Sequence, residues 1–394
     1  MRILVVSHTY IVDLNCEKLR ALVALSPEIE VTVVVPRRWR PGGVQNRIVE
    51  PQPLQEGSFR LVPVSNFSQN NQGLLCFGLE LVSLLRQFQP QVIQVEQGSK
   101  ALAYAQMITL NKLLGLGAKN VFFTWWNLPY ELKFPVSLLE RYTLQQTDGA
   151  LAGNQDGAEI LQQRGYSGPI QVLPQLGVDP HLFQPQPQPE LAGSLEIEAA
   201  DFVIGFVGRF VAEKGLLTLL QAVTQLGDRP WKLLLLGRGP LKQTLLEKVE
   251  QAGISDRIIW VESVPHDAVP HYINLMQVLV LPSETTEGFK TLTAAGWKEQ
   301  FGHVLIEAMA CRVPVIGSDS GEIPHVIGRA GLVFPEGNVA ALAECLQKLI
   351  DQPQLQADLA EQGHARAMSQ YTNHALAQQQ LAFYQSLGVR LGDG

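Results

Sequence analysis

Short apolar runs that alternate with helical segments recur in both halves of the chain, and this repeat most strongly limits the fold. In the first half, runs at residues 3–6 and 31–35 flank a helical stretch at 14–25. Such runs, bounded by polar residues, are typical of strands buried on both faces of a parallel sheet. The second half restarts the pattern with a run at 202–207 and a helix from 216. We therefore predict an α/β protein with two Rossmann-like, doubly wound domains.

The composition agrees with two folded domains. A chain of 394 residues exceeds what one core usually supports, and its 46% hydrophobic and 17% charged residues argue against disorder. The formal net charge of −7 gives no global basic field, so we expect no nucleic-acid partner. The four cysteines stand apart, without a Cys-x-x-Cys motif, which fits a reducing compartment. No apolar run reaches the length of about 18 residues that a spanning helix needs, and no signal-peptide pattern is present. We expect a cytoplasmic protein and leave peripheral contact with the inner membrane face open.

A stretch in which glutamine and proline alternate, residues 184–189, marks the clearest change of composition. Alternating proline cannot join a sheet and favours an extended connector. The predicted segments are an N-terminal domain over 1–182, a linker over 183–198, a C-terminal domain over 199–370 and a terminal helix over 371–394.

Two carboxylates stand eight residues apart around a glycine. Gly302 precedes the apolar run 304–310, which predicts a buried helix, with Glu299 before it and Glu307 within it. A glycine allows a ligand close to the backbone, and the first helical turn offers unpaired N–H groups that suit a phosphate. A carboxylate within an apolar helix needs a polar partner, such as a sugar or ribose diol. Either carboxylate alone is more often an ordinary surface charge.

Two basic residues bracket one loop after the strand at 202–207. Gly208 and Arg209 leave the strand, and Lys214 precedes the next helix. Arginine offers a planar fork and lysine a mobile point charge, which together suit a pyrophosphate leaving group. In isolation they would be surface charges, but beside the two carboxylates they predict a phosphate clamp.

These motifs resemble the donor-site signature of retaining glycosyltransferases of the group 1 type (family four). The matching stretches, in the order that the family shows, are GFVGRFVAEKG (205–215), LLLLGRGP (233–240), VLVLPSE (278–284) and EQFGHVLIEAMA (299–310). The resemblance implies the GT-B architecture, in which two Rossmann-like domains face a cleft and the last helix crosses back to the N-terminal domain. It also implies retention of anomeric configuration.

The resemblance implies transfer of a hexosyl unit from a nucleotide-diphosphate sugar to a polysaccharide, lipid-linked or small glycoside acceptor. The residues it implies for catalysis are Arg209, Lys214, Glu299 and Glu96. Those it implies for donor binding are Gly208, Arg209, Lys214, Val261, Glu262, Phe301, Gly302, His303 and Glu307. No Asp-x-Asp motif occurs, so we expect a reaction without a metal and without a cofactor.

The acceptor-side candidates follow expected strands of the first domain, and they are His8, Glu96, Trp126 and Asn127. The family often has a glycine pair in the first of these loops and a histidine at one or both later strand ends. This chain has Glu96 and Asn127 at the later strand ends. Glu96 is interpreted as a base or a sugar ligand, and Trp126 as a stacking surface or a core residue.

Two further stretches have a less specific interpretation. Residues 36–43 place three arginines around a tryptophan, where a solvated loop is favoured over contact with an anionic lipid or acceptor. The connection over 284–296 is longer than the family usually has, and it predicts a lid or binding loop.

Three other functions stay open to different degrees. A nucleotide-sugar epimerase or hydrolase of the same architecture would use the same phosphate clamp. A dehydrogenase is disfavoured, because neither opening strand is followed by Gly-x-Gly-x-x-Gly. A non-catalytic nucleotide-sugar-binding protein would keep Arg209, Lys214 and Glu307 but lack a competent acceptor side.

Overall fold

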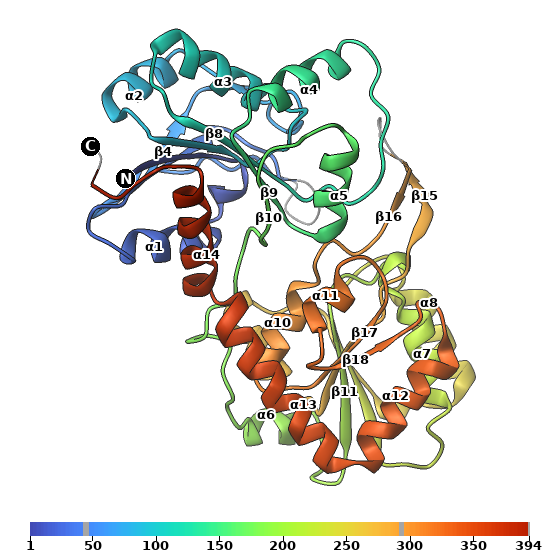
Figure 1. Ribbon diagram of the computed structural model, residues 1–394. Helices are drawn as coiled ribbons and strands as arrows, with labels where there is room; N and C mark the ends of the chain where they lie inside the picture. The colour runs from blue at the N-terminus through green and yellow to red at the C-terminus, as the bar shows by residue number, and fades with distance from the viewer. Residues whose placement is uncertain (42–46, 291–294, 393–394) are drawn as a thin grey trace. The chain divides into compact units, whose positions relative to one another are not determined.

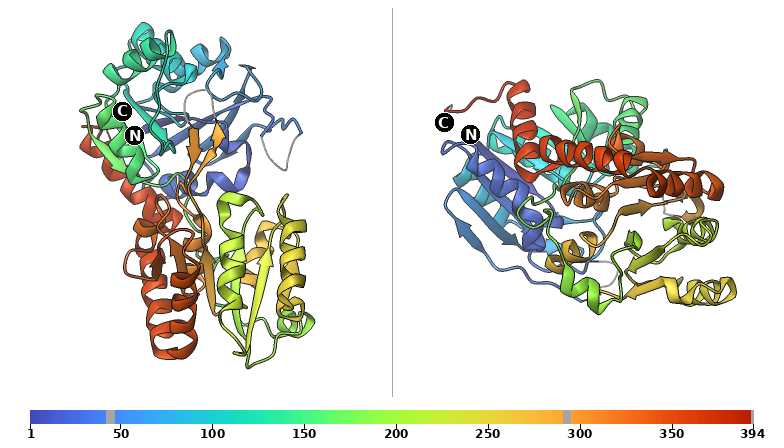
Figure 2. Two further views of the ribbon diagram at one scale, coloured as in Figure 1. Left: turned by 90° about the vertical axis from the view of Figure 1, so that its right-hand side faces the viewer. Right: turned by 90° about the horizontal axis from the view of Figure 1, so that it is seen from below.

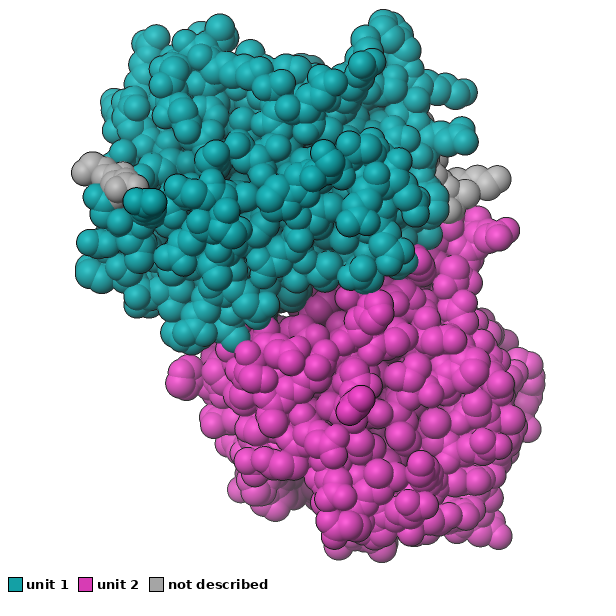
Figure 3. Space-filling model, in the orientation of Figure 1, with its two compact units in different colours: residues 1–177, 373–394 teal, residues 178–372 magenta. Residues whose placement is uncertain are grey.

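The chain forms two compact units in a computed structural model that describes residues 1–41, 47–290 and 295–392 (Figures 1 and 2). Unit 1 consists of residues 1–177 and 373–394, and unit 2 of residues 178–372 (Figure 3). The first unit thus ends slightly before the predicted position 182. Because its last segment comes from the C-terminus, unit 1 is discontinuous in sequence whereas unit 2 is continuous.

Unit 1 contains an eight-stranded sheet in the order β10-β9-β8-β7-β1-β2-β4-β3. Its neighbouring strands are parallel except for β3 and β4. The strands are β1 (Arg2–Val6), β2 (Glu30–Pro36), β3 (Leu54–Glu56), β4 (Phe59–Val64), β7 (Val92–Val95), β8 (Lys119–Thr124), β9 (Gly149–Ala152) and β10 (Ile170–Val172). A separate pair is formed by β5 (Asn66–Phe67) and β6 (Cys76–Phe77).

Successive residues of a strand point to opposite faces of the sheet. Both faces of this sheet carry apolar side chains, and helices cover each of them. Ile3 and Val5 join one core, to which α1 and α14 contribute, and Leu4 and Val6 join the other, to which α2, α3 and α5 contribute. Helix α14 packs against α1, as the red and blue helices show in Figure 1. The helices are α1 (Glu17–Ala24), α2 (Glu80–Phe88), α3 (Leu102–Leu114), α4 (Val136–Gln145), α5 (Gln155–Gln163) and α14 (Asn373–Ser386), with 3-10 turns at Thr9–Ile11 and Asp13–Cys16.

Unit 2 contains a six-stranded parallel sheet in the order β13-β12-β11-β14-β17-β18. Its strands are β11 (Phe202–Val207), β12 (Trp231–Leu236), β13 (Ile258–Val261), β14 (Val278–Leu281), β17 (Val315–Ser318) and β18 (Leu332–Phe334). Helix α7 packs against α12, and α10 against α13. The helices are α6 (Pro189–Ser194), α7 (Leu216–Thr224), α8 (Lys242–Ala252), α9 (Val269–Ile273), α10 (His303–Ala310), α11 (Ile323–Ile327), α12 (Val339–Asp351) and α13 (Pro353–Arg366). Shorter turns are Ala212–Lys214, Ser255–Arg257, His266–Ala268 and the π-helical Ala367–Tyr371.

Each sheet has one point at which the strand order reverses. In unit 1 it lies between β1 and β7, and in unit 2 between β11 and β14. Doubly wound folds bind ligands outside the carboxyl ends of the strands at this point, because the following loops diverge there. The loops after these four strands are therefore where functional side chains are expected.

Two segments differ from the sequence prediction. Within the predicted extended linker, residues 189–194 form α6, and Pro189 lies in its first turn, where a helix does not need the missing N–H group. The long connection predicted as a loop contains an antiparallel strand pair, β15 (Thr286–Lys290) and β16 (Ala295–Trp297), while residues 291–294 lie outside the described residues. Its β-branched and aromatic residues suit a strand pair.

Candidate functional site

Lys214 and Glu299 form a buried ion pair at the switch point of unit 2. Lys214 ends the turn after β11, and Glu299 lies between β16 and α10. The side chains are 15% and 9% exposed, so little water screens the pair. Gly215 makes this approach possible, because a Cβ atom there would lie 1.8 Å from the carbonyl oxygen of Pro282. The sequence predicted both residues for the donor site, and the fold brings them together.

Two side chains from neighbouring segments complete the surroundings of this pair. Ser283, which follows β14, donates a hydrogen bond of 2.8 Å to Oε2 of Glu299, the oxygen that Lys214 also contacts. Trp297, at the end of β16, places its ring centroid 5.1 Å from Nζ of Lys214. A lysine ammonium at this distance from an indole is stabilised by the ring quadrupole. The ion pair is thus held by a hydroxyl on one side and an aromatic ring on another.

Helix α10 begins directly beside this cluster. Gly302 caps it with φ of 83°, a left-handed conformation that glycine adopts without strain. Glu307, one turn further along, is half-buried, and its carboxylate makes no ion pair or hydrogen bond with any described residue. Desolvation raises the pKa of Glu307 to about 7. A carboxylate in this condition lacks the polar partner that burial normally requires.

The remaining donor-site candidates of unit 2 have less distinctive surroundings. Arg209 is 63% exposed and has Glu213 at 3.8 Å. The Val261 carbonyl accepts a hydrogen bond from the Gly237 N–H, and Glu262 forms a surface ion pair with Lys242. That pair holds the pKa of Glu262 below its ordinary value, chiefly through the hydrogen bond from Lys242. Gly208 follows β11, and Phe301 and His303, whose rings lie 4.8 Å apart, flank Gly302.

Glu96 lies at the switch point of unit 1, where its carboxylate is enclosed by the protein. It is 5% exposed and accepts hydrogen bonds from Tyr10 Oη at 2.9 Å, Gln94 Nε2 at 2.7 Å and Gln175 Nε2 at 2.6 Å. The sequence predicted a base or sugar ligand here. These three donors connect the carboxylate to the core, where the Tyr384 hydroxyl of α14 donates to Gln94, and the catalytic role of Glu96 stays a prediction.

The other candidates after β8 are also engaged by neighbouring residues. Asn127 is 4% exposed. The indole of Trp126 has the ammonium of Lys100 3.7 Å from its ring centroid, and the same ammonium lies 3.7 Å from the ring of Tyr130. In this structure one face of Trp126 is therefore covered by a cation, whereas the sequence left open a stacking surface or a core role.

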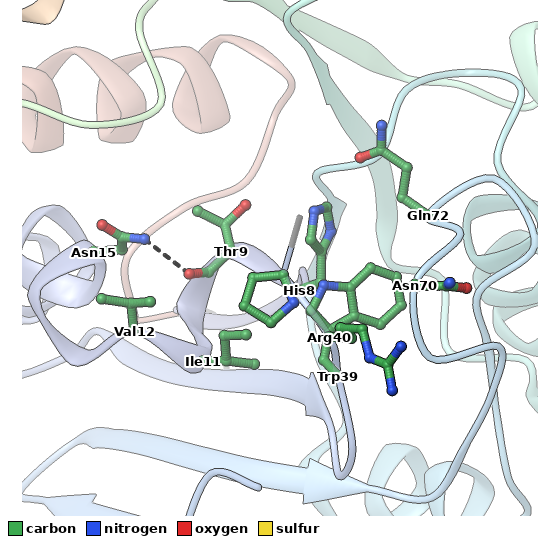
Figure 4. A pocket seen from close by; sticks show the side chains of 10 residues that line it. His8, Thr9, Ile11, Val12, Asn15, Trp39, Arg40, Asn70 and Gln72 are labelled. Carbon is green, nitrogen blue, oxygen red and sulfur yellow. Dashed lines mark hydrogen bonds between the residues drawn. The ribbon is translucent and has the colours of Figure 1, made fainter. Parts of the chain in front are cut away.

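His8 lines a pocket of about 390 Å³ within unit 1 (Figure 4). The pocket lies at the carboxyl end of β1 and β2, and its polar lining consists of His8, Thr9, Asn15, Arg40, Asn70 and Gln72. Its volume is in the range of small-molecule sites. The imidazole packs against Trp39, with ring centroids 4.9 Å apart, and desolvation lowers the pKa of His8 to about 4. His8 is thus a neutral side chain at neutral pH.

Several residues of these sites were not among the sequence candidates. Ser283 follows a buried strand directly, which is the same signal that selected Glu96. Trp297 carries no such signal, because only the pairing of β15 with β16 places it over Lys214. Asn70 and Gln72 carry no sequence signal, whereas Arg40 belongs to the stretch 36–43 for which the sequence favoured a solvated loop over an anionic partner. A hydrogen bond from the Arg40 N–H to the Gln69 carbonyl joins the two loops.

Residues 187–366 match the family model described as glycosyl transferases group 1. This segment, a little less than half of the chain, is thus similar to the group 1 glycosyl transferases. It includes the Lys214–Glu299 pair and Glu307, so the match covers the site described in unit 2.

Curated proteins that are similar to part of this chain include an alpha-D-kanosaminyltransferase and a 2-deoxystreptamine glucosyltransferase, both from Streptomyces kanamyceticus. The first is 26% identical over 191 residues, covering 48% of this chain and 46% of the relative. The second is 32% identical over 155 residues, covering 38% of this chain and 37% of the relative. The chain thus matches less than half of the length of these relatives.

Solved structures match across nearly the whole chain. A sucrose-phosphate synthase from Thermosynechococcus elongatus aligns with a TM-score of 0.68 and 19% identity, covering 98% of this chain and 99% of that one. The HepE protein of Anabaena, solved in complex with UDP, aligns with a TM-score of 0.71 and 17% identity, covering 98% and 100%. These likenesses confirm the predicted fold class, the two-domain α/β architecture of GT-B glycosyltransferases.

None of the helices in the described residues combines the length and apolar character needed to cross a membrane. Nor do the histidine, cysteine, aspartate and glutamate side chains within the described ranges form a group of three or more that could hold a metal ion.

Proposed function

We propose that this protein is a retaining glycosyltransferase that moves a hexosyl unit from a nucleotide-diphosphate sugar to a carbohydrate or glycolipid acceptor. The reaction would need no metal and no cofactor. The bond between sugar C1 and the diphosphate oxygen breaks, a bond forms between C1 and an acceptor hydroxyl oxygen, and the hydroxyl releases its proton. The cytoplasmic location and any peripheral contact with a membrane remain predictions from the sequence.

The observation that carries the proposal is the arrangement of Lys214, Glu299 and Glu307 at the switch point of unit 2. Lys214 supplies a positive charge in a poorly hydrated position. Negative charge develops on the departing diphosphate, and a preformed cation stabilises it strongly where water is excluded. The backbone N–H groups at the start of α10 add donors for the same phosphate.

The two carboxylates then have separate tasks in sugar recognition. Ser283 and Lys214 share Oε2 of Glu299, so these two residues fix the orientation of the carboxylate, which is assigned to sugar hydroxyls. Glu307, which no described residue pairs, is assigned to the ribose diol, whose two hydroxyls can donate to both carboxylate oxygens.

The comparisons support the same chemistry. The matched relatives are named as sugar transferases, and the HepE structures contain UDP, UDP with glucose, or UDP-glucose. A nucleotide sugar is therefore the donor class with the best support for this chain.

The test is nucleotide release from a panel of UDP-, GDP- and ADP-sugars, with and without EDTA. The wild type is expected to turn over one donor in both conditions. Lys214→Ala should reduce turnover by about 100- to 1000-fold, the effect of removing one preorganised donor to developing charge. Glu307→Ala should raise the donor KM, while Lys248→Ala, a change of an exposed lysine on α8, should leave both constants unchanged.

Each alternative function predicts a different outcome. Release of nucleotide and free sugar in the presence of acceptors would indicate a hydrolase, and an altered sugar on an intact nucleotide would indicate an epimerase. Tight donor binding without turnover would indicate a binding protein. Activity lost in EDTA and restored by manganese would contradict the metal-free reaction, and unaltered turnover in Lys214→Ala would refute the proposed clamp.

A further inference from the structure

The pocket of unit 1 is built from three loops, two that leave the carboxyl edge of the sheet and one that follows the separate strand β5. His8 and Thr9 follow β1, Arg40 follows β2, and Asn70 and Gln72 follow β5 (Figure 4). The hydrogen bond of 2.6 Å from the Arg40 N–H to the Gln69 carbonyl holds the last two loops together. The pocket is thus shaped by the fold of unit 1 at the edge where doubly wound folds bind ligands.

The charge in the pocket comes from one arginine. Three arginines lie close together after β2, but Arg37 pairs with Glu80 at 3.0 Å and Arg38 with Glu50 at 2.9 Å. Arg40 has no carboxylate partner among the described residues. The residues that line the pocket include no aspartate or glutamate. An anion that enters therefore meets one unpaired guanidinium and no opposing charge.

The rest of the polar lining is neutral and can both donate and accept hydrogen bonds. The side-chain amides of Asn15, Asn70 and Gln72 have this capacity, as does the Thr9 hydroxyl. The Nδ1 atom of His8 is buried without a hydrogen-bond partner in the described part of the chain. Leaving such an atom unsatisfied costs free energy, but because this atom is buried it is not among the groups that a ligand contacts. The amides and the Thr9 hydroxyl suit the hydroxyls of a sugar.

We propose that this pocket binds an acceptor saccharide that carries one anionic group, a carboxylate or a phosphate, paired with Arg40. The anionic group lies at the guanidinium, and the sugar hydroxyls hydrogen-bond to the amides and to the Thr9 hydroxyl. That the saccharide is an acceptor rests on the proposed function. The preference for an anionic saccharide is a property of the pocket and can be measured by itself.

The experiment measures binding of D-glucuronic acid, glucose 6-phosphate and D-glucose to the full chain by saturation-transfer NMR at pH 7. At least one anionic sugar should bind about fivefold or more tightly than glucose, because a guanidinium paired with a carboxylate or phosphate adds a charge-assisted hydrogen bond. The difference between glucuronic acid and glucose 6-phosphate identifies the anionic group. Arg40→Gln should remove the preference and leave glucose binding unchanged, whereas Arg40→Lys should keep part of it.

Arg38→Gln is the matched control, since Arg38 is exposed in the same loop but paired with Glu50. It should leave the preference intact. Lys214→Ala should also leave it intact, which separates this pocket from the site in unit 2. The melting temperature of each variant verifies that it is folded.

Equal binding of charged and neutral sugars, an equal effect of Arg38→Gln, or no sugar binding would overturn the proposal. So would binding of phosphatidylglycerol vesicles that depends on Arg40 in the absence of sugar binding, which would identify a membrane surface instead. Nucleotide release is recorded on the same samples. If Arg40-dependent sugar binding occurs without nucleotide release, the pocket assignment stands and the transferase proposal fails.

Discussion

Glu307 is the residue whose surroundings differ most from those of an ordinary glutamate. Desolvation raises its pKa from the ordinary 4.5 to about 7 in the folded protein. Between these values the folded protein binds more protons than the unfolded chain, so this group lowers the free energy of unfolding as pH rises, and the full loss is present above pH 7. This loss of stability disappears if a ligand diol donates hydrogen bonds to the carboxylate.

Glu307→Gln should therefore stabilise unit 2 at pH 8 and have little effect at pH 4.5. We expect a gain in the free energy of unfolding on the order of 2 kcal/mol at pH 8, below the full linkage value because the side chain is partly exposed. Urea unfolding at both pH values measures the difference, with Glu247→Gln on the exposed face of α8 as control. An equal change at both pH values would show that Glu307 titrates normally.

Glu96 contrasts with Glu307, because it is a buried carboxylate to which the fold supplies hydrogen-bond donors. Glu96→Gln replaces one acceptor oxygen with an amide and leaves a donor unpaired, so it should destabilise unit 1 by about 1–3 kcal/mol. Turnover should fall less than about tenfold, whereas loss of a general base costs about 100- to 10,000-fold. Tyr10→Phe, which removes one of the donors, should likewise destabilise unit 1 while turnover falls less than about tenfold. A large loss of turnover at unchanged stability would support Glu96 as the base.

At the scale of elements, the β15–β16 pair brings an aromatic ring to the proposed phosphate clamp. Trp297 faces Lys214 at the end of β16. Trp297→Ala should free the ammonium and raise the donor KM about twofold to 30-fold, the range of a cation–π contact of about 0.5–2 kcal/mol. Trp297→Phe should recover part of the loss. Thr286→Ala is the control, because Thr286 pairs with Trp297 in the strand register but leaves the ring in place. Unchanged kinetics in Trp297→Ala would mean that the contact does not support the clamp.

At the scale of the whole molecule, unit 1 is built from two separate segments of the chain, whereas unit 2 is built from one. Helix α14 belongs to unit 1, where Leu376, Phe383 and Tyr384 are buried in the core. The Gly177 N–H donates to Oδ1 of Asn373 at 3.1 Å, so the two segments of unit 1 meet at their junction. Unit 2 needs no such return of the chain.

We expect residues 178–372 alone to unfold cooperatively, and residues 1–177 alone to be unstable because their core lacks α14. Joining Gly177 to Asn373 through a short Gly/Ser linker should restore a cooperative unit 1, since the two ends already lie side by side. Thermal unfolding followed by circular dichroism compares the three fragments. Equal melting temperatures of 1–177 with and without α14 would show that the helix is dispensable.

The sequence by itself determined buried strands such as residues 3–6, 31–35 and 202–207, because short apolar runs bounded by polar residues can be recognised without their partners. It did not determine α6, β15 or β16, which form where a linker and a loop were predicted. It also selected Lys214, Glu299 and Glu307, since their motif is local or lies at a strand end. Only the tertiary structure decided what each charged group touches. Ser283 and Trp297 meet Lys214 and Glu299 across separate strands, and the donors that enclose Glu96 come from distant loops. The pattern of apolar residues specifies which face is buried, but the pairing of polar groups depends on which loops the finished sheets bring to one edge.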